Sequence, residues 1–183
     1  FARVDEINPK PQPFSFFEHL VFMALLYFSE QEVDFAVLET GLGGRFDPTN
    51  LFDPVLSIIT QIGYDHMDIL GNCIEKIAYE KAGIIKKGIP VVLGPKAVRN
   101  SILQEAGKKN SPVMYAEASN FSSYREENRL IAKKALQYLD MPADEAIEKN
   151  PPCRFEKIYP NVVLDAAHNH PGFEALFQEL KRE

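Results

Sequence analysis

The sequence predicts an α/β fold in which a mainly parallel sheet is flanked by helices. Short apolar runs alternate along the chain with longer segments whose apolar residues have helical spacing. The apolar runs lack the polar–apolar alternation of half-exposed strands, so we expect them to be covered on both faces. The chain has 183 residues, of which 45% are hydrophobic and 25% charged, which is enough for one core and part of a second.

The first predicted helix begins at Ser15, after a polar, proline-containing loop at residues 1–13. Ser15 and Glu18 have the spacing of a capping box, in which each side chain accepts from a free backbone N–H of the first turn. The run that follows, residues 16–28, is apolar nearly all round, so we expect this helix to be well buried.

Three apolar runs predict the first strands of the sheet, at residues 35–38, 55–60 and 89–93. The first run leads into a glycine-rich turn at residues 40–45. A helix predicted at residues 73–85 separates the second and third runs, and two lysines and a glycine mark its end.

Helical patterns return at residues 101–109 and 126–139, and a short strand is predicted between them at residues 113–115. Residues 140–152 are acidic and proline-rich, which is typical of a domain linker. We therefore expect the first domain to end in this segment.

A second α/β unit is predicted after the linker, with a buried strand at residues 162–164 and a helix from Pro171. We assign residues 1–145 to one α/β domain and residues 146–183 to the beginning of a second, Rossmann-like domain. Because Phe1 is not an initiator methionine and the last residues lie inside a predicted helix, we expect an incomplete chain.

Charge and cysteine content exclude several classes of partner. The net charge of −6 argues against bulk attraction to nucleic acid or to an anionic membrane, although local groups can still bind small anions. Cys73 and Cys153 form no CxxC unit, so we expect the reducing cytoplasm. The apolar run at residues 20–28 is too short to span a bilayer, and no secretory signal is visible. We expect a monomer.

Polar side chains follow three of the predicted strands. Glu39 comes after the first, Asp65 and His66 after the second, and Asp165 after the last. Ligands of open α/β sheets bind beyond the carboxyl ends of the strands, so these groups indicate a cleft. The alternative is that each acid is a turn or cap residue.

Lys81 lies on the apolar face of its predicted helix, seven residues after Ile74 and four from both Ile77 and Ile85. A buried ammonium is costly unless it is paired or chemically altered. One interpretation is a salt bridge to an acid at the strand ends, or a buried stem whose head reaches water. The other is a lysine held at a phosphate or metal site.

The glycine-rich turn, Gly41-Leu-Gly-Gly44, is neither a Walker A loop nor a dinucleotide fingerprint. Glycine allows the backbone to approach a ligand or to take a positive φ. A plain tight turn is equally compatible with these residues.

Several long motifs resemble the folylpolyglutamate and dihydrofolate synthases of the Mur ligase superfamily. They are, in order, Glu39-Thr-Gly-Leu-Gly-Gly-Arg-Phe-Asp-Pro-Thr-Asn50, Ile59-Thr-Gln-Ile-Gly-Tyr-Asp-His-Met-Asp-Ile-Leu-Gly71, Ile77-Ala-Tyr-Glu-Lys-Ala-Gly-Ile-Ile-Lys86, Arg154-Phe-Glu156 and Leu164-Asp-Ala-Ala-His-Asn169. Order and local spacing agree over residues 14–95 and 151–170. The resemblance implies a Mur-ligase-like central ATPase domain followed by the opening of a C-terminal domain.

The resemblance also implies an activity. The expected protein is an ATP- and Mg²⁺-dependent ligase that joins L-glutamate to dihydropteroate or to folate through an acyl phosphate. Glu39 and His66 would be ligands of one Mg²⁺, although histidine is an unusual ligand for this ion. Lys81 would be carbamylated, which turns a buried cation into an anion that holds a second Mg²⁺.

Further roles follow for residues that would hold the nucleotide and the pteridine. The resemblance implies adenine packing by Asn128, nucleotide contacts by Arg154, a ribose contact by Asp165, phosphate proximity for His168, and pterin or folate contacts by Arg45 and Asp47. Phe16, Phe17 and Glu18 could border the same pocket, or simply start the helix.

The sequence departs from the family pattern in two important ways. The N-terminal phosphate loop is absent, and the stretch between Tyr115 and Asn128 is much too short. We therefore expect a polypeptide of these residues alone not to turn over ATP. The alternatives are a Mur-type ligase for a cell-wall precursor and a non-catalytic nucleotide-binding scaffold derived from the ligase.

Overall fold

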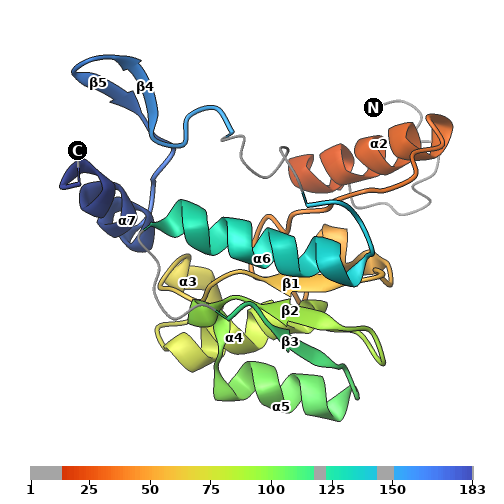
Figure 1. Cartoon of the computed structure of the whole chain (residues 1–183). Coiled ribbons are helices and arrows are strands. Elements are labelled where there is room, and N and C mark those ends of the chain that lie inside the picture. Colours follow the sequence, from red (N-terminus) through yellow and green to blue (C-terminus); the bar gives the residue numbers. More distant parts are fainter. Residues whose placement is uncertain (1–13, 118–122, 144–150, 183) are drawn as a thin grey trace.

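The computed structural model describes residues 14–117, 123–143 and 151–182. Its centre is a three-stranded parallel sheet in the order β1-β2-β3 (Figure 1), made of β1 (Ser57–Ile59), β2 (Val91–Leu93) and β3 (Val113–Tyr115). Ser57 lies opposite Val91, and Val91 lies opposite Val113. The predicted α/β class with a parallel sheet is confirmed.

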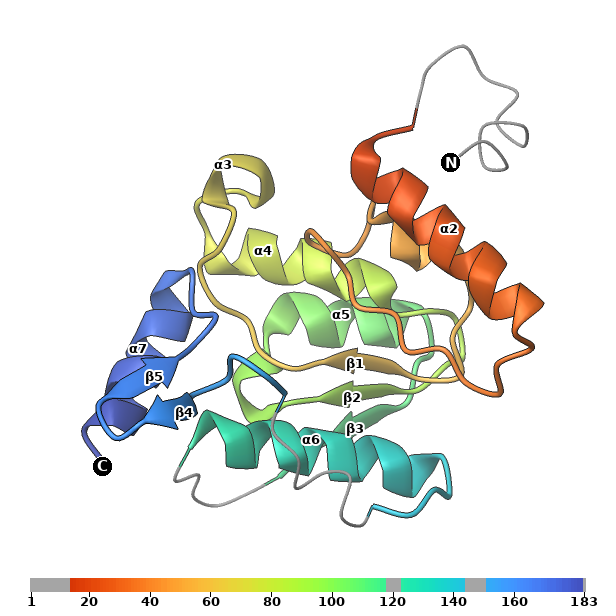
Figure 2. The same ribbon diagram turned by 90° about the horizontal axis from the view of Figure 1, so that it is seen from above.

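Helices cover both faces of the sheet. Figures 1 and 2 show α4 (Ile74–Lys81) and α5 (Asn100–Lys108) on one face and α6 (Tyr124–Tyr138) on the other. Short helical turns connect these elements: η1 (Pro48–Leu51), α3 (Met67–Leu70), η2 (Ala82–Ile84) and η3 (Pro95–Ala97). The helices predicted at residues 73–85 and 101–109 are therefore present as α4 and α5, and the helix predicted at residues 126–139 is present as α6.

The side chains of β2 alternate between two cores. Val91 and Leu93 belong to the larger core under α4 and α5, together with the fully buried Ile77. Val92 points to the opposite side, where it packs with Ile131 of α6. A strand that is covered on both faces has no place for a polar residue, and this explains its unbroken apolar sequence.

The helix α2 (Phe16–Glu30) has the predicted start, but not the predicted burial. Ser15 N donates to Glu18 Oε2 at 2.7 Å, and Glu18 N donates to Ser15 Oγ at 3.3 Å, which completes the capping box. The expectation of a well-buried helix is wrong, because only Val21 is buried and Phe16 is 71% exposed. The helix lies at the periphery (Figure 2), so only one side of it has a protein surface to pack against.

The strand predicted at residues 35–38 is also wrong. This segment forms no ladder with β1 within the described chain, and Val37 is 94% exposed. An apolar run becomes a strand only where a neighbouring strand accepts and donates its backbone hydrogen bonds. The described residues supply no such neighbour on the outer side of β1.

The C-terminal part forms a hairpin and a helix. The strand predicted at residues 162–164 is present as β5 (Val162–Leu164), but it pairs antiparallel with β4 (Glu156–Tyr159). Its predicted burial is wrong, since only Val163 is partly covered. The helix α7 (His170–Leu180) begins one residue before the predicted Pro171. The predicted domain boundary at residues 145 and 146 lies outside the described residues.

Among the helices of the described segments, none combines the length and the apolar character needed to cross a bilayer.

Glu75 supplies a testable link between α4 and α5. Its carboxylate accepts from Ser101 N at 3.2 Å and from the Ser101 hydroxyl, at the N-terminus of α5. These hydrogen bonds favour the ionised form and lower the pKa of Glu75 from its ordinary value of 4.5.

We expect Glu75→Gln to weaken the pH dependence of stability. Because the folded pKa is lowered, the stabilisation is present above the unfolded pKa and is lost as the pH falls through the folded pKa. Urea unfolding of both proteins between about pH 6 and pH 3 should give a shallower decline for the variant. An identical slope in both proteins would show that this contact does not contribute to acid sensitivity.

Candidate functional site

The glycine-rich loop is organised by one buried carboxylate. Asp47, which is 6% exposed, accepts from Gly41 N at 2.8 Å and from Leu42 N at 2.9 Å. Its second oxygen accepts from Thr49 N at 3.0 Å and from the Thr49 hydroxyl at 2.5 Å, which caps η1. Gly43 takes the left-handed conformation with φ of 64°. Glycine takes a positive φ without the strain that other residues would have, so this turn requires glycine at position 43.

A cavity of about 790 Å³ lies beside this loop. Its lining is mostly apolar and is contributed by Phe17, Gly41, Leu42, Gly43, Gly44, Phe46, Asp47, Pro48, Ile69, Leu70 and Glu80. A concave, mostly apolar site suits a flat, largely apolar ring. Asp47 is among the lining residues, whereas Arg45 is not, and the predicted contacts of both residues with a pterin or folate stay predictions.

The loop also lies directly on the carboxyl end of α4. Arg45 N donates to Glu80 O at 2.9 Å. A Cβ added at Gly44 would lie 3.0 Å from Lys81 O, and one added at Gly83 would lie 2.3 Å from Arg45 Cα. The two glycines therefore allow one part of the backbone to approach another, and this contact places the loop next to Lys81.

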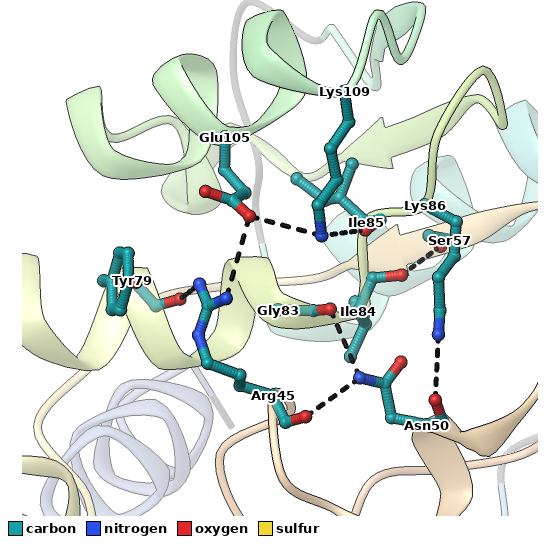
Figure 3. Close-up of polar contacts among 10 residues, drawn as sticks. All are labelled: Arg45, Asn50, Ser57, Tyr79, Gly83, Ile84, Ile85, Lys86, Glu105 and Lys109. Carbon is teal, nitrogen blue, oxygen red and sulfur yellow. Dashed lines mark hydrogen bonds and ion pairs between the residues drawn. The ribbon is translucent and has the colours of Figure 1, made fainter.

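Polar side chains join the same two segments (Figure 3). Asn50 Nδ2 donates to Arg45 O at 3.1 Å and to Gly83 O at 3.2 Å. Lys86 Nζ donates to Asn50 O at 2.8 Å, and Ser57 Oγ donates to Ile84 O at 2.9 Å. The loop, β1 and the turn after α4 are held as one unit.

Lys81 is the last residue of α4 and is partly buried. No salt bridge to Glu39 or Asp65 is found for it within the described segments, so that structural interpretation has no support there. Glu39 is exposed, and the His66 side chain is 46% exposed at the start of α3. No group of three or more His, Cys, Asp or Glu side chains in the described residues is arranged to hold a metal ion. The predicted metal ligands remain predictions.

The loop after β1 meets the loop before α7. Asn169 Nδ2 donates to Asp65 Oδ2 at 3.0 Å, and a Cβ added at Gly63 would lie 2.8 Å from Pro171 Cγ. His66 adopts a left-handed conformation with φ of 47°, and its ring nitrogen Nε2 lies 3.8 Å from Asp65 Oδ2. This contact brings Asp65, one of the predicted strand-end groups, next to the segment that follows Asp165.

The residues predicted to hold a nucleotide are spread over α6, the segment before β4 and the loop before α7. Asp165 accepts from Phe155 N and from Ala167 N, both at 2.8 Å, so each carboxylate oxygen already has one donor. His168 is exposed, and its Nδ1 lies 3.0 Å from Ala166 O. Asn128 and Arg154 are exposed. The predicted contacts of these side chains with a nucleotide stay predictions.

Sequence reasoning missed several residues that the structure places at these junctions. Arg125 of α6 donates to Phe155 O at 3.0 Å and lies over the Phe155 ring at 5.2 Å, which joins α6 to the hairpin. Glu80 lines the cavity, and Asn169 bonds Asp65. The only sequence signal for Glu80 and Asn169 was their place inside the quoted motifs.

We expect Gly83→Ala to destabilise the chain by about 1–3 kcal/mol, because its methyl group would overlap the backbone of Arg45. Gly107→Ala is the matched control, since nothing lies within 4 Å of a Cβ added there in α5. That change should be neutral or stabilise by about 0.5–1 kcal/mol. Urea unfolding measures both, and equal free energies of unfolding would contradict the close contact.

Comparison with known proteins agrees with this geometry. The family described as Mur ligase middle domain matches residues 4–148. The dihydrofolate synthase/folylpolyglutamate synthase of Bacillus subtilis is 37% identical, covering 91% of this chain and 49% of the relative. The folylpolyglutamate synthase of Lacticaseibacillus casei is 31% identical, with the same two coverages of 91% and 49%. The chain thus spans about half the length of these relatives.

The alignment with the Bacillus subtilis protein runs over 212 positions, more than the 183 residues of the chain. That relative therefore contains segments with no counterpart here.

Solved structures show the same fold. The E. coli FolC complex with ADP superposes with a TM-score of 0.88 at 26% identity, covering 100% of this chain and 51% of that chain. A structure described as an FPGS–AMPPCP–folate complex superposes with a TM-score of 0.81 at 29% identity, covering 99% of this chain and 55% of that chain. The chain belongs to the Mur ligase middle-domain family.

Proposed function

We propose that this chain is part of an ATP-dependent ligase that joins L-glutamate to dihydropteroate, to folate, or to both. The observation that carries the proposal is the apolar cavity at the glycine-rich loop, which lies against the end of α4 that carries Lys81. The names of the similar solved complexes, which include ADP, AMPPCP, folate and DHPP, support the same substrate classes. Relatives named for folate chemistry favour it over cell-wall synthesis.

The reaction would proceed in two displacements. An oxygen of the substrate carboxylate attacks the γ-phosphorus of ATP, the bond to the β-phosphate oxygen breaks, and ADP leaves. The neutral amine of glutamate then attacks the acyl carbon, phosphate leaves with the bonding electrons, and the nitrogen loses a proton. The protein's contribution is to position these groups and to neutralise charge.

Magnesium would supply Lewis-acid charge neutralisation when bound. Glu39 fits an oxygen ligand, because its carboxylate has no hydrogen bond or ion pair within the described chain. His66, with half of its side chain exposed, is the other proposed ligand of the first ion. Lys81 fits only if it is altered, because an ammonium cannot bind a cation.

Carbamylation would make that change. The neutral Lys81 amine adds to the carbon of CO₂ and releases one proton, which leaves an anionic carbamate that could hold a second ion. The partial burial of Lys81, together with the lack of an anionic partner in the described residues, supports this proposal.

The pteridine ring would occupy the cavity, with Phe17 and Phe46 beside it and Asp47 at the loop. For the nucleotide we propose Asn128 at the adenine, Asp165 at the ribose, and Arg154 and His168 nearer the phosphates. Each oxygen of Asp165 has accepted one N–H and keeps a lone pair for a ribose hydroxyl.

We also propose that the protein is a monomer in the cytoplasm. Both cysteines are free, which is expected of a protein in a reducing compartment.

The substrate assignment is tested with the intact gene product. We expect ADP release with dihydropteroate, tetrahydrofolate or both to rise when L-glutamate is added. Coupled assays should include each pteridine with and without glutamate. ADP release that neither pteridine stimulates would rule out the folate assignment, and would favour a cell-wall ligase or a scaffold.

The role of Lys81 has a separate test. Lys81→Ala should lower the rate of glutamate ligation at least about 100-fold, because charge stabilisation at the phosphates is lost. Lys87→Ala is the matched control, since Lys87 is exposed, whereas Lys86 holds Asn50 and would disturb the loop. Intact-mass measurement in bicarbonate should detect a carbamate on the unaltered protein and none on Lys81→Ala. Full activity of Lys81→Ala would refute the assignment.

A further inference from the structure

Arg45 was expected at the pteridine, but its side chain turns toward α4 and α5 instead (Figure 3). Arg45 Nη2 donates to Tyr79 O at 3.1 Å, and the guanidinium lies 4.0 Å from the centre of the Tyr79 ring. Arg45 Nη1 lies 3.7 Å from Glu105 Oε1. The side chain is 21% exposed and does not line the cavity.

These contacts fall on the carboxyl end of α4. The last four carbonyls of a helix lack partners inside it, and the helix dipole puts negative potential there. Tyr79 and Glu80 belong to this last turn, and Arg45 supplies donors to both: its guanidinium to Tyr79 O and its backbone N–H to Glu80 O. One residue of the loop therefore caps the helix with a charge and with two hydrogen-bond donors.

Glu105 fixes the direction of the guanidinium. This carboxylate is 7% exposed and lies between two cations, Arg45 at 3.7 Å and Lys109 Nζ at 3.2 Å. A buried acid needs such partners, because an unpaired charge in the interior is costly. Lys109 Nζ also donates to Ile85 O at 2.6 Å. Arg45 is therefore bonded to the beginning of the segment from Tyr79 to Ile85, and Lys109 is bonded to its end.

We infer that Arg45 is a positioning residue, which caps α4 and thereby holds Lys81 against the glycine-rich loop, and that it does not contact the pteridine. The catalytic role of Lys81 in this inference rests on the proposed function. Asn50 reinforces the cap, since it bonds Arg45 O and Gly83 O on either side of the same junction.

The first test measures the local stability of the end of α4. Hydrogen exchange of the Lys81 and Ala82 amides is compared in the unaltered chain, Arg45→Ala, Arg45→Lys and Lys96→Ala. Arg45→Ala should speed this exchange about fivefold to tenfold, as expected for losing a charged helix cap. Arg45→Lys, which keeps the charge, should recover part of the protection.

Lys96→Ala is the matched control, because it removes a cation from another buried carboxylate, Glu127 of α6, but no contact with α4. It should change the exchange of the Lys81 and Ala82 amides less than about twofold. Equal effects of Arg45→Ala and Lys96→Ala would overturn the inference, because they would show a general loss of stability.

The second test separates positioning from substrate contact in the intact gene product. Arg45→Ala should lower kcat about tenfold or more while KM for the pteridine changes less than about twofold, because a misplaced Lys81 affects the reaction rather than pteridine binding. Arg45→Lys should restore part of kcat. A rise in KM with unchanged kcat and exchange would instead place Arg45 at the substrate and overturn the inference.

The two proposals can fail separately. If the unaltered gene product ligates no glutamate, the proposed function fails, while the exchange comparison still decides whether Arg45 caps the helix end that carries Lys81.

Discussion

The close backbone contact between the glycine-rich loop and the carboxyl end of α4 is the constraint on which the candidate site depends. Gly44 and Gly83 allow the two segments to approach without side chains between them. The cavity then forms beside the loop, with Leu70 and Glu80 in its lining, while Arg45 and Asn50 make polar contacts with residues at and after the end of α4. The loop cannot shift without moving the last turn of α4.

The sheet supplies the rigid frame for this contact. Because β2 is buried on both faces, α4 and α5 on one side and α6 on the other are fixed relative to one another. The segment after β1 is then held from outside by the Asp65–Asn169 hydrogen bond. Lys81, at the end of α4, is therefore attached to a frame whose position is set mainly by apolar packing.

Local patterns in the sequence predicted the elements that depend on local physics. The capping box at Ser15, the strand at residues 113–115 and the helix that carries Lys81 follow from caps, apolar runs and helical spacing. Burial of α2 and pairing of residues 35–38 depend instead on what lies opposite them, and an apolar sequence carries no information about a missing neighbour. Arg45 shows the same limit, because Glu105 lies far along the chain and no local sequence pattern predicts their pairing.

The glycine at position 83 affects how mutational tolerance at this site should be interpreted. A side chain there would overlap main-chain atoms of Arg45, which cannot repack as a side chain would. No second-site change of a neighbouring side chain would relieve the overlap. Intolerance at Gly83 in a deep mutational scan would therefore report a steric limit of the backbone, and would not identify a residue that touches ATP or the pteridine.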